Sequence, residues 1–222
     1  MKSPRQQPGE HMNSESKVID EPRTVALRLR ELGVEPKVLR DAILDGEAAR
    51  ESCTAHDPVQ MPGFLAWGRV VRGLRDRLVP DNWKARDHRG YATVVSPDES
   101  IAIAVATGNE VTGTAGAGAS TKYPKGAATV TAVECNQLEL FAPDQPSVEK
   151  PTTVTWLLLI RREGDGIHAE LSRPELLDTK GFVARWSERI LLELIDVEPE
   201  PTVEPHHDVD EIEIEVTRRT TA

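Results

Sequence analysis

Residues 62–79 read PGFLAWGRVVRGLRDRLV, and this stretch carries the strongest helical pattern in the chain. At about 3.6 residues per turn, its large apolar residues fall within about 120° of the helix circumference. Those residues are Phe64, Trp67, Val70, Val71, Leu74 and Leu78. Pro62 suits the first turn of a helix, and Pro80 cannot continue one. The pattern therefore predicts a helix that packs one face against a core.

Two shorter helices are predicted upstream of this one. The segment 24–33 is rich in Leu and Arg and ends at Gly33. Pro36 fits the first residue of a second helix, which is expected to run to about Ser52. Its apolar stripe would consist of Leu39, Ala42, Ile43 and Ala49.

Downstream of Asp81 the residues become β-branched or alternate between apolar and polar over short runs, which is typical of strands. The predicted strands are Ala92–Ser96, Ser100–Thr107, Ala128–Cys135, Val154–Arg162, Ile167–Ser172 and Glu188–Val197. Gly164, Asp165 and Gly166 are expected to form a hairpin turn between two of them. Helices followed by strands favour an α+β fold, with the N-terminal helices packed on a mainly antiparallel sheet.

The two ends of the chain differ from this middle part. Residues 1–21 are polar and contain Pro, Gly, Ser and Gln, which is typical of disorder. Residues 198–222 form an acidic tail, in which EIEIEV at 211–216 fits either an edge strand or a disordered segment. Between disordered ends we predict a single domain, 22–197, made of a helical part, 22–80, and a β-rich part, 81–197.

The composition limits the class of protein. The 222 residues carry a net charge of −10. Phosphate repulsion keeps so acidic a protein from coating DNA non-specifically, although a local basic face can still contact it. No apolar run reaches the roughly 18 residues of a membrane span, and the N-terminus lacks the apolar region of a secretory signal. Cys53 and Cys135 are too few for a disulfide framework. We therefore expect a cytoplasmic protein with no membrane partner.

Two long connections interrupt the predicted strands, 108–127 and 142–153. Loops of this length tend to be functional or disordered. In the first, Gly113 and Gly118 have the spacing of a Walker A loop, but the lysine of that motif is missing. A strand is predicted next, so the helix N-terminus that would bind phosphate is also missing. A plain flexible loop explains these glycines, but two lysines could still contact a nucleic-acid backbone: Lys122 and Lys125.

Motifs for metal binding or catalysis are incomplete. Only C-x-x-H at 53–56 resembles a paired zinc motif, and a buried cysteine beside a loop cap explains it equally well. A restriction-type nuclease needs an acidic residue followed by E-x-K on a strand. Asp98 and Glu134 fit the acidic positions, but Asn136 stands where lysine is required. The sequence therefore predicts no catalytic residue, no cofactor and no metal.

Arginines follow the outer side of the 62–79 helix at a spacing of three residues. They are Arg69, Arg72 and Arg75. A guanidinium group binds phosphate through two parallel hydrogen bonds, so this face is a candidate nucleic-acid contact. A charged outer face is also what any soluble helix presents.

Residues 137–141 read QLELF. This peptide resembles the Q-L-S/D-L-F peptides by which bacterial DNA polymerases, repair proteins and replication initiators bind the sliding clamp. It departs from them in carrying Glu139 where Ser or Asp is usual, and the resemblance covers these five residues only. The implied contacts are Leu140 and Phe141 in a hydrophobic pocket of the clamp, Gln137 in polar contacts beside it and Leu138 in a second shallow site.

The same alternating residues could instead extend the predicted strand 128–135. Our leading hypothesis is a non-catalytic accessory protein of DNA replication or repair that binds the bacterial sliding clamp, with DNA as a second candidate partner. One alternative is a metal-dependent enzyme that processes nucleic acid or a phosphate ligand, with Asp98, Glu134 and the two lysines at its site. The other is a protein–protein adaptor unrelated to DNA, whose acidic tail binds the partner.

Overall fold

The computed structural model describes residues 16–88, 90–141, 153–164 and 166–197. Its elements, in chain order, are β1 (Lys17–Ile19), α1 (Pro22–Glu31), α2 (Pro36–Glu51), α3 (Met61–Leu78), a short 3-10 helix (Val79–Asp81), β2 (Lys84–His88), β3 (Tyr91–Val95), β4 (Ile101–Thr107), α4 (Ala127–Phe141), β5 (Val154–Glu163), β6 (Gly166–Leu177), β7 (Val183–Leu191) and β8 (Ile195–Asp196). The three N-terminal helices and the hairpin between β5 and β6 confirm the sequence prediction.

The described strands form one sheet of eight, in the order β1-β7-β6-β5-β4-β3-β2, with β8 paired to β6. β1 pairs with β7, and β4 with β5, in parallel. The other described pairs are antiparallel. The fold is therefore α+β with a mainly antiparallel sheet, as the sequence predicts.

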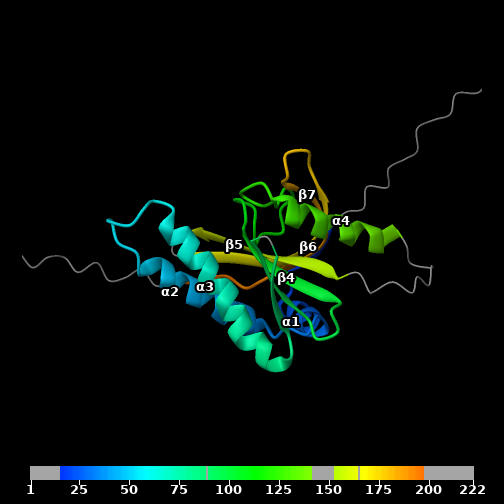
Figure 1. Ribbon diagram of the computed structural model, residues 1–222, viewed down its shortest axis with the longest axis horizontal. Coiled ribbons are helices and arrows are strands. Elements are labelled where there is room, and N and C mark those ends of the chain that lie inside the picture. Colours follow the sequence, from blue (N-terminus) through cyan, green and yellow to red (C-terminus); the bar gives the residue numbers. More distant parts are fainter. Residues whose placement is uncertain (1–15, 89, 142–152, 165, 198–222) are drawn as a thin grey trace, which may run out of the picture.

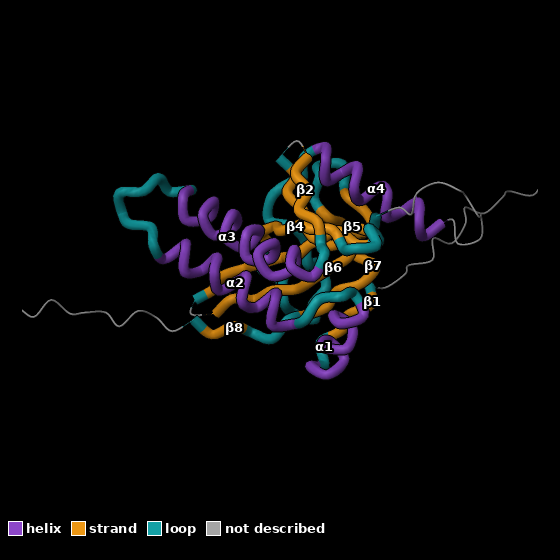
Figure 2. The backbone as a smooth tube through the Cα atoms, turned by 60° about the horizontal axis from the view of Figure 1, so that its bottom comes forward, coloured by secondary structure: helices purple, strands orange, loops and turns teal. Residues whose placement is uncertain are grey.

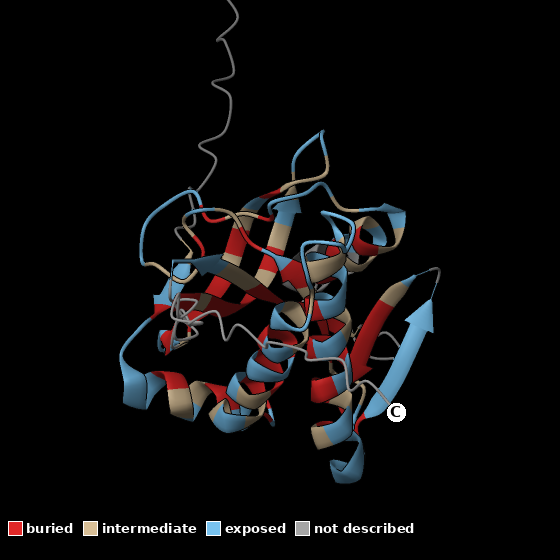
Figure 3. Cartoon of the chain, turned by 90° about the vertical axis from the view of Figure 1, so that its left-hand side faces the viewer, coloured by how far each residue is buried: buried red, intermediate tan, exposed pale blue. Residues whose placement is uncertain are grey.

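Both faces of the sheet are covered. Successive side chains of β4 belong to different cores: Ile103 packs with the residues of α1 to α3, whereas Ala104 packs in a smaller core with Trp186 of β7. In Figure 1, α1, α2 and α3 lie on one side of the sheet and α4 lies on the other. Figure 3 shows the buried residues between these layers and exposed residues along the outer sides of the helices. Because β5 is covered on both faces, it reads as an almost continuous apolar run.

Small residues let α2 and α3 pack closely. A Cβ atom at Gly46 would lie 2.4 Å from Cγ2 of Val70, and one at Gly73 would lie 3.0 Å from Cα of Ala42. The apolar stripe predicted on α3 is buried over its C-terminal half. At the N-terminal half the prediction is wrong, because Phe64 is 64 % exposed and Trp67 is 42 % exposed.

The predicted strand 128–135 is wrong, because these residues lie in the helix α4. Threonine and valine at 129–133 favour a strand by local propensity, but tertiary packing overrides such preferences. The side chains of Thr129, Val133 and Asn136 are buried, a spacing of four and three residues that matches one face of a helix. The alternative that 137–141 extends a strand is wrong for the same reason.

Two edge strands were missed. β1 lies inside the predicted disordered segment 1–21, where its three residues pair with β7. All five residues of β2 are exposed, so it shows no apolar alternation in the sequence. The predicted strand Glu188–Val197 is divided between β7 and β8. The acidic tail 198–222 lies outside the described residues.

Candidate functional site

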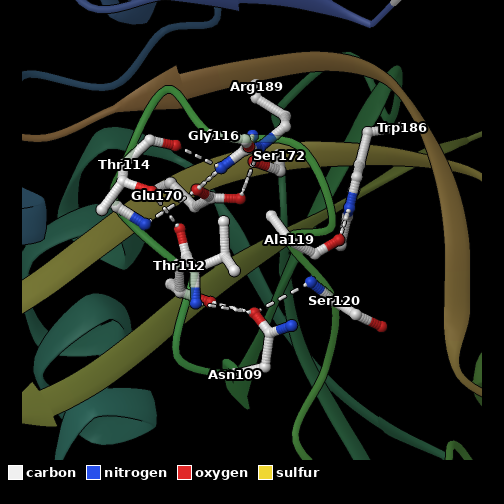
Figure 4. A network of polar contacts seen from close by, with 12 residues as sticks. Asn109, Thr112, Thr114, Gly116, Ala119, Ser120, Glu170, Ser172, Trp186 and Arg189 are labelled. Atoms are coloured by element: carbon white, nitrogen blue, oxygen red, sulfur yellow. Dashed lines mark hydrogen bonds and ion pairs between the residues drawn. The ribbon is translucent and has the colours of Figure 1, made fainter.

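The glycine-rich segment 108–121 is bound to the sheet by a buried ion pair (Figure 4). Nε of Arg189 donates to Oε1 of Glu170 at 3.1 Å, and its Nη2 donates to Oε2 at 2.6 Å. The guanidinium group also donates to two carbonyl oxygens of the segment, those of Thr114 and Gly116, both at 2.9 Å. The backbone N–H of Gly113 donates to Oε2 of Glu170 at 2.9 Å. Both charged groups thus also form hydrogen bonds to the backbone of the segment.

A second set of contacts closes the segment on itself. Asn109 donates from Nδ2 to the carbonyl oxygen of Gly118 at 2.8 Å, and its Oδ1 accepts from the N–H of Ser120 at 3.1 Å. The indole N–H of Trp186 donates to the carbonyl oxygen of Ala119 at 2.7 Å. Figure 4 shows Asn109, Ala119, Ser120 and Trp186 around one folded loop. The segment is therefore an ordered part of the fold, and the N–H of Gly113 already has an acceptor.

The three predicted arginines of α3 have different surroundings. Arg75 donates to the carbonyl oxygens of Arg86 and Thr93, at 2.9 and 3.1 Å, and forms an ion pair with Asp87. It joins α3 to β2 and β3, so its guanidinium group is not free for phosphate. Arg72 pairs with Asp76, one helical turn away, at 3.2 Å. Arg69 is exposed on the outer face. The basic face is therefore narrower than the sequence predicts.

The surroundings of the two acidic candidates, Asp98 and Glu134, differ from those of metal ligands. Asp98 lies in the turn between β3 and β4, where its Oδ1 accepts from the hydroxyl of Ser96 at 2.6 Å. It also accepts from the N–H and the hydroxyl of Ser100, at 3.1 and 2.8 Å. These hydrogen bonds, led by that of Ser96, lower the pKa of Asp98 to about 2. Glu134 is exposed on α4. In the described part of the chain, no three His, Cys, Asp or Glu residues are grouped so that they could hold a metal ion.

Lys122 and Lys125 lie between the end of β4 and the start of α4. Nζ of Lys122 is 5.8 Å from the centre of the Tyr123 ring. Lys125 is half-buried, and burial lowers the pKa of its ammonium group. It borders an open groove of about 490 Å³ together with Glu134 and Lys180.

Residues 137–141 form the C-terminal end of α4. The side chains of Gln137, Leu138, Glu139, Leu140 and Phe141 lie outside the described part of the structure. The residue before them, Asn136, anchors α4 to the sheet. Its Nδ2 donates to the carbonyl oxygens of Thr155 and Pro174, at 2.9 and 3.0 Å, and its Oδ1 accepts from the N–H of Thr155 at 2.8 Å.

Sequence reasoning missed this role of Asn136. Thr155 pairs with Ala102 of β4 on one side. On the other side the Asn136 side chain takes the place of a strand, because the pairing of β5 with β6 begins only at Leu157 and Ser172. The one available signal was an amide residue beside Cys135, between Glu134 and Gln137, and it indicates neither partner.

No protein-family model, curated protein or solved structure matches this chain. Its function is therefore inferred from the residues themselves. Within the described ranges, none of the helices combines the length and the apolar character needed to cross a membrane.

Proposed function

We propose that this chain is a non-catalytic accessory protein of DNA replication or repair, acting in the bacterial cytoplasm, that binds the sliding clamp through residues 137–141. The observation that carries the proposal is the resemblance of QLELF at 137–141 to the clamp-binding peptides. These five residues form the C-terminal end of α4.

The position of the helix end supports display of the peptide. In Figures 1 and 2 the C-terminal end of α4 projects beyond the strands of the sheet. The residues that follow in the sequence include Pro143, Pro146 and Pro151. Proline disfavours pairing with a sheet, so these residues favour a segment that stays accessible to a partner.

The last turns of α4 have little electrostatic support. The final four carbonyl groups of a helix have no N–H donor within the helix. The negative end of the helix dipole lies there and disfavours an acidic residue such as Glu139. The last turn contains no basic residue that would offset it. These electrostatic features lower the free energy needed to unwind 137–141 into an extended ligand.

The two side chains expected in the clamp pocket allow the affinity for the clamp to be estimated. The resemblance implies that Leu140 and Phe141 enter a hydrophobic pocket of the clamp, and burial of each such side chain contributes about 1.5–3 kcal/mol. The loss of freedom on binding and the unwinding of the helix end offset part of this. We expect a dissociation constant in the micromolar range.

The direct test is binding of the purified full-length chain to a bacterial sliding clamp, measured by isothermal titration calorimetry. Micromolar binding is expected for the native chain and should disappear in a Leu140→Ala/Phe141→Ala variant. The matched control is Leu27→Ala/Leu194→Ala, because both leucines are more than half exposed. This control should bind normally.

A synthetic peptide of residues 134–145 separates the motif from the fold. It should compete with the full chain for the clamp. Absence of binding by both the chain and the peptide would contradict the proposal. The metal-dependent enzyme has less support, since the carboxylate of Asp98 is engaged by Ser96 and Ser100.

A further inference from the structure

The described lysines divide into two groups. Three form ion pairs with acidic residues: Lys17, Lys37 and Lys84. The other three form no ion pair within the described residues: Lys122, Lys125 and Lys180. These three lie together, because the N–H of Lys125 donates to the carbonyl oxygen of Gly181 at 2.8 Å. A cluster of cations without acidic partners favours binding of an anion.

Two exposed aromatic residues, Trp67 and Tyr123, lie near these lysines. Among the large apolar residues described as exposed, the aromatic ones are Phe64, Trp67 and Tyr123. Nε1 of Trp67 donates to the carbonyl oxygen of Val105 at 3.3 Å, and the N–H of Lys122 donates to that of Thr107 at 2.9 Å. The two carbonyl groups are two residues apart on β4, which corresponds to about 7 Å. Trp67 and the Lys122–Tyr123 pair therefore lie at the same end of one strand.

Two adjacent hollows are bordered by three of these side chains, Trp67, Lys125 and Lys180. Trp67 and Lys125 border a small hollow of about 120 Å³. Lys125 also borders the groove of about 490 Å³ that contains Lys180. Two acidic residues border this groove as well, Glu134 and Asp178. Asp178 already accepts from the N–H groups of Lys180 and Phe182.

We propose that this aromatic–lysine surface, formed by Trp67, Lys122, Tyr123, Lys125 and Lys180, binds single-stranded nucleic acid. Unpaired bases stack on exposed aromatic rings, and lysines along a groove hold the phosphates. A duplex hides its base faces, so the aromatic residues would contribute nothing to its binding. The net charge of −10 opposes non-specific coating, which restricts nucleic acid to this local surface. The inference goes beyond clamp binding and does not depend on it.

The test uses the full-length chain and fluorescent oligonucleotides of about 15 nucleotides, within the size range that such surfaces cover. Fluorescence anisotropy at about 50 mM salt should give micromolar binding of oligo-dT, oligo-rU or both, and this comparison separates DNA from RNA as the natural ligand. A duplex of the same length should bind at least tenfold more weakly. Equal or tighter binding of the duplex would overturn the proposal.

Variants then locate the surface. Tyr123→Ala should weaken binding of the single strand about tenfold, and Tyr123→Phe should restore it because the ring still stacks. Lys122→Ala/Lys180→Ala should lower the slope of log K against log salt by about 1.4, or 0.7 for each phosphate that a lysine no longer neutralises. The matched control is Lys37→Ala, an exposed lysine on α2. Circular dichroism checks that each variant is folded.

Three further outcomes are decisive. The Leu140→Ala/Phe141→Ala variant should bind single strands normally, which separates this inference from the clamp proposal. Binding that is unchanged in both the Tyr123 and the lysine variants would refute the surface. Binding of poly-glutamate without binding of any oligonucleotide would assign the surface to an acidic protein partner instead, and would also overturn the proposal.

Discussion

Glu170 of β6 and Arg189 of β7 form a bidentate ion pair between adjacent strands, with both side chains buried. The pair does not only join the two strands. Its remaining hydrogen bonds reach the backbone of the 108–121 segment, so one pair of charges fixes a loop of the chain that is distant in sequence. The loop resembles a phosphate-binding loop by its glycines, whereas its contacts show a structural role.

Removing one charge of this pair should destabilise the protein strongly. Arg189→Ala leaves the buried carboxylate of Glu170 without its partner, and such changes cost about 3–5 kcal/mol. Urea unfolding followed by circular dichroism measures the change. Arg30→Ala is the control, because its ion pair with Glu35 is exposed and should contribute less than about 1 kcal/mol. Similar losses of stability in the two variants would contradict the role assigned to Arg189.

Asn136 should be essential for the attachment of α4. Asn136→Leu removes the acceptor of the Thr155 N–H and the donor for two carbonyl groups. Each buried polar group left without a partner costs about 1–3 kcal/mol, so we expect stability to fall by at least about 2 kcal/mol. Faster hydrogen exchange at the amide of Thr155 would locate the effect. Thr131→Ala, an exposed change on the same helix, should alter stability by less than about 0.5 kcal/mol. A stable Asn136→Leu variant with a protected Thr155 amide would refute the anchoring role.

Replacement by alanine should change the stability in opposite directions at two glycines of α2 and α3. At Gly46 the added Cβ would lie 2.4 Å from Val70 and 2.9 Å from the carbonyl oxygen of Ala66, so overpacking should cost about 1–3 kcal/mol. At Gly68 of α3 the added Cβ would meet no atom within 4 Å apart from its chain neighbours and the backbone of its own helix. There the better helix propensity of alanine should stabilise the protein by up to about 1 kcal/mol. Thermal unfolding of both variants gives the comparison, and equal effects would be inconsistent with this packing.

The turn at Asp98 should contribute stability that depends on pH. The pKa of Asp98 in the folded state is about 2, below its ordinary value, so the carboxylate form is the one that folding favours. A depressed pKa gives stability that is complete above the unfolded-state pKa of about 3.9 and is lost as the pH falls through about 2. Asp98→Asn should therefore lower the unfolding temperature most above about pH 4, with the difference from the native chain shrinking toward pH 2.

The measurement is the unfolding temperature of both chains across this pH range. Glu51→Gln is the control, because no hydrogen bond or ion pair of the Glu51 side chain is found among the described residues. It should have little effect at any pH in this range. A difference between native and Asp98→Asn chains that stays constant down to pH 2 would show that the turn does not depend on the carboxylate charge.

Some parts of the fold could be predicted because their signals are local. The periodicity and the flanking prolines of 62–79 place α3 within one residue at each end. The apolar run of β5 and the glycine turn after it likewise indicate a hairpin without further information. By contrast, the exposed residues of β2 carry no apolar pattern, and β1 has three residues only. Edge strands of this kind are defined by hydrogen bonds to a neighbour rather than by their own side chains.

The candidate sites divide in the same way. The peptide 137–141 could be found because it is contiguous in the sequence. The position of Trp67 near Lys122 and Lys125 could not, because folding brings both α3 and the segment after β4 to the end of β4. The sequence also does not show whether a charged side chain already has a partner in the fold. Arg69 and Arg75 belong to one arginine series, but only the fold gives Arg75 two carbonyl acceptors on the sheet.

The sequence by itself determined the α+β class, the three N-terminal helices and the central strands, because periodicity and proline placement act over a few neighbouring residues. Tertiary structure alone decided that 127–141 is a helix and that Asn136 is its anchor. The partners of Asn136 lie 19 and 38 residues further along the chain. Whether a polar residue is satisfied in a core depends on the backbone groups that folding brings to it, and local sequence does not specify these groups.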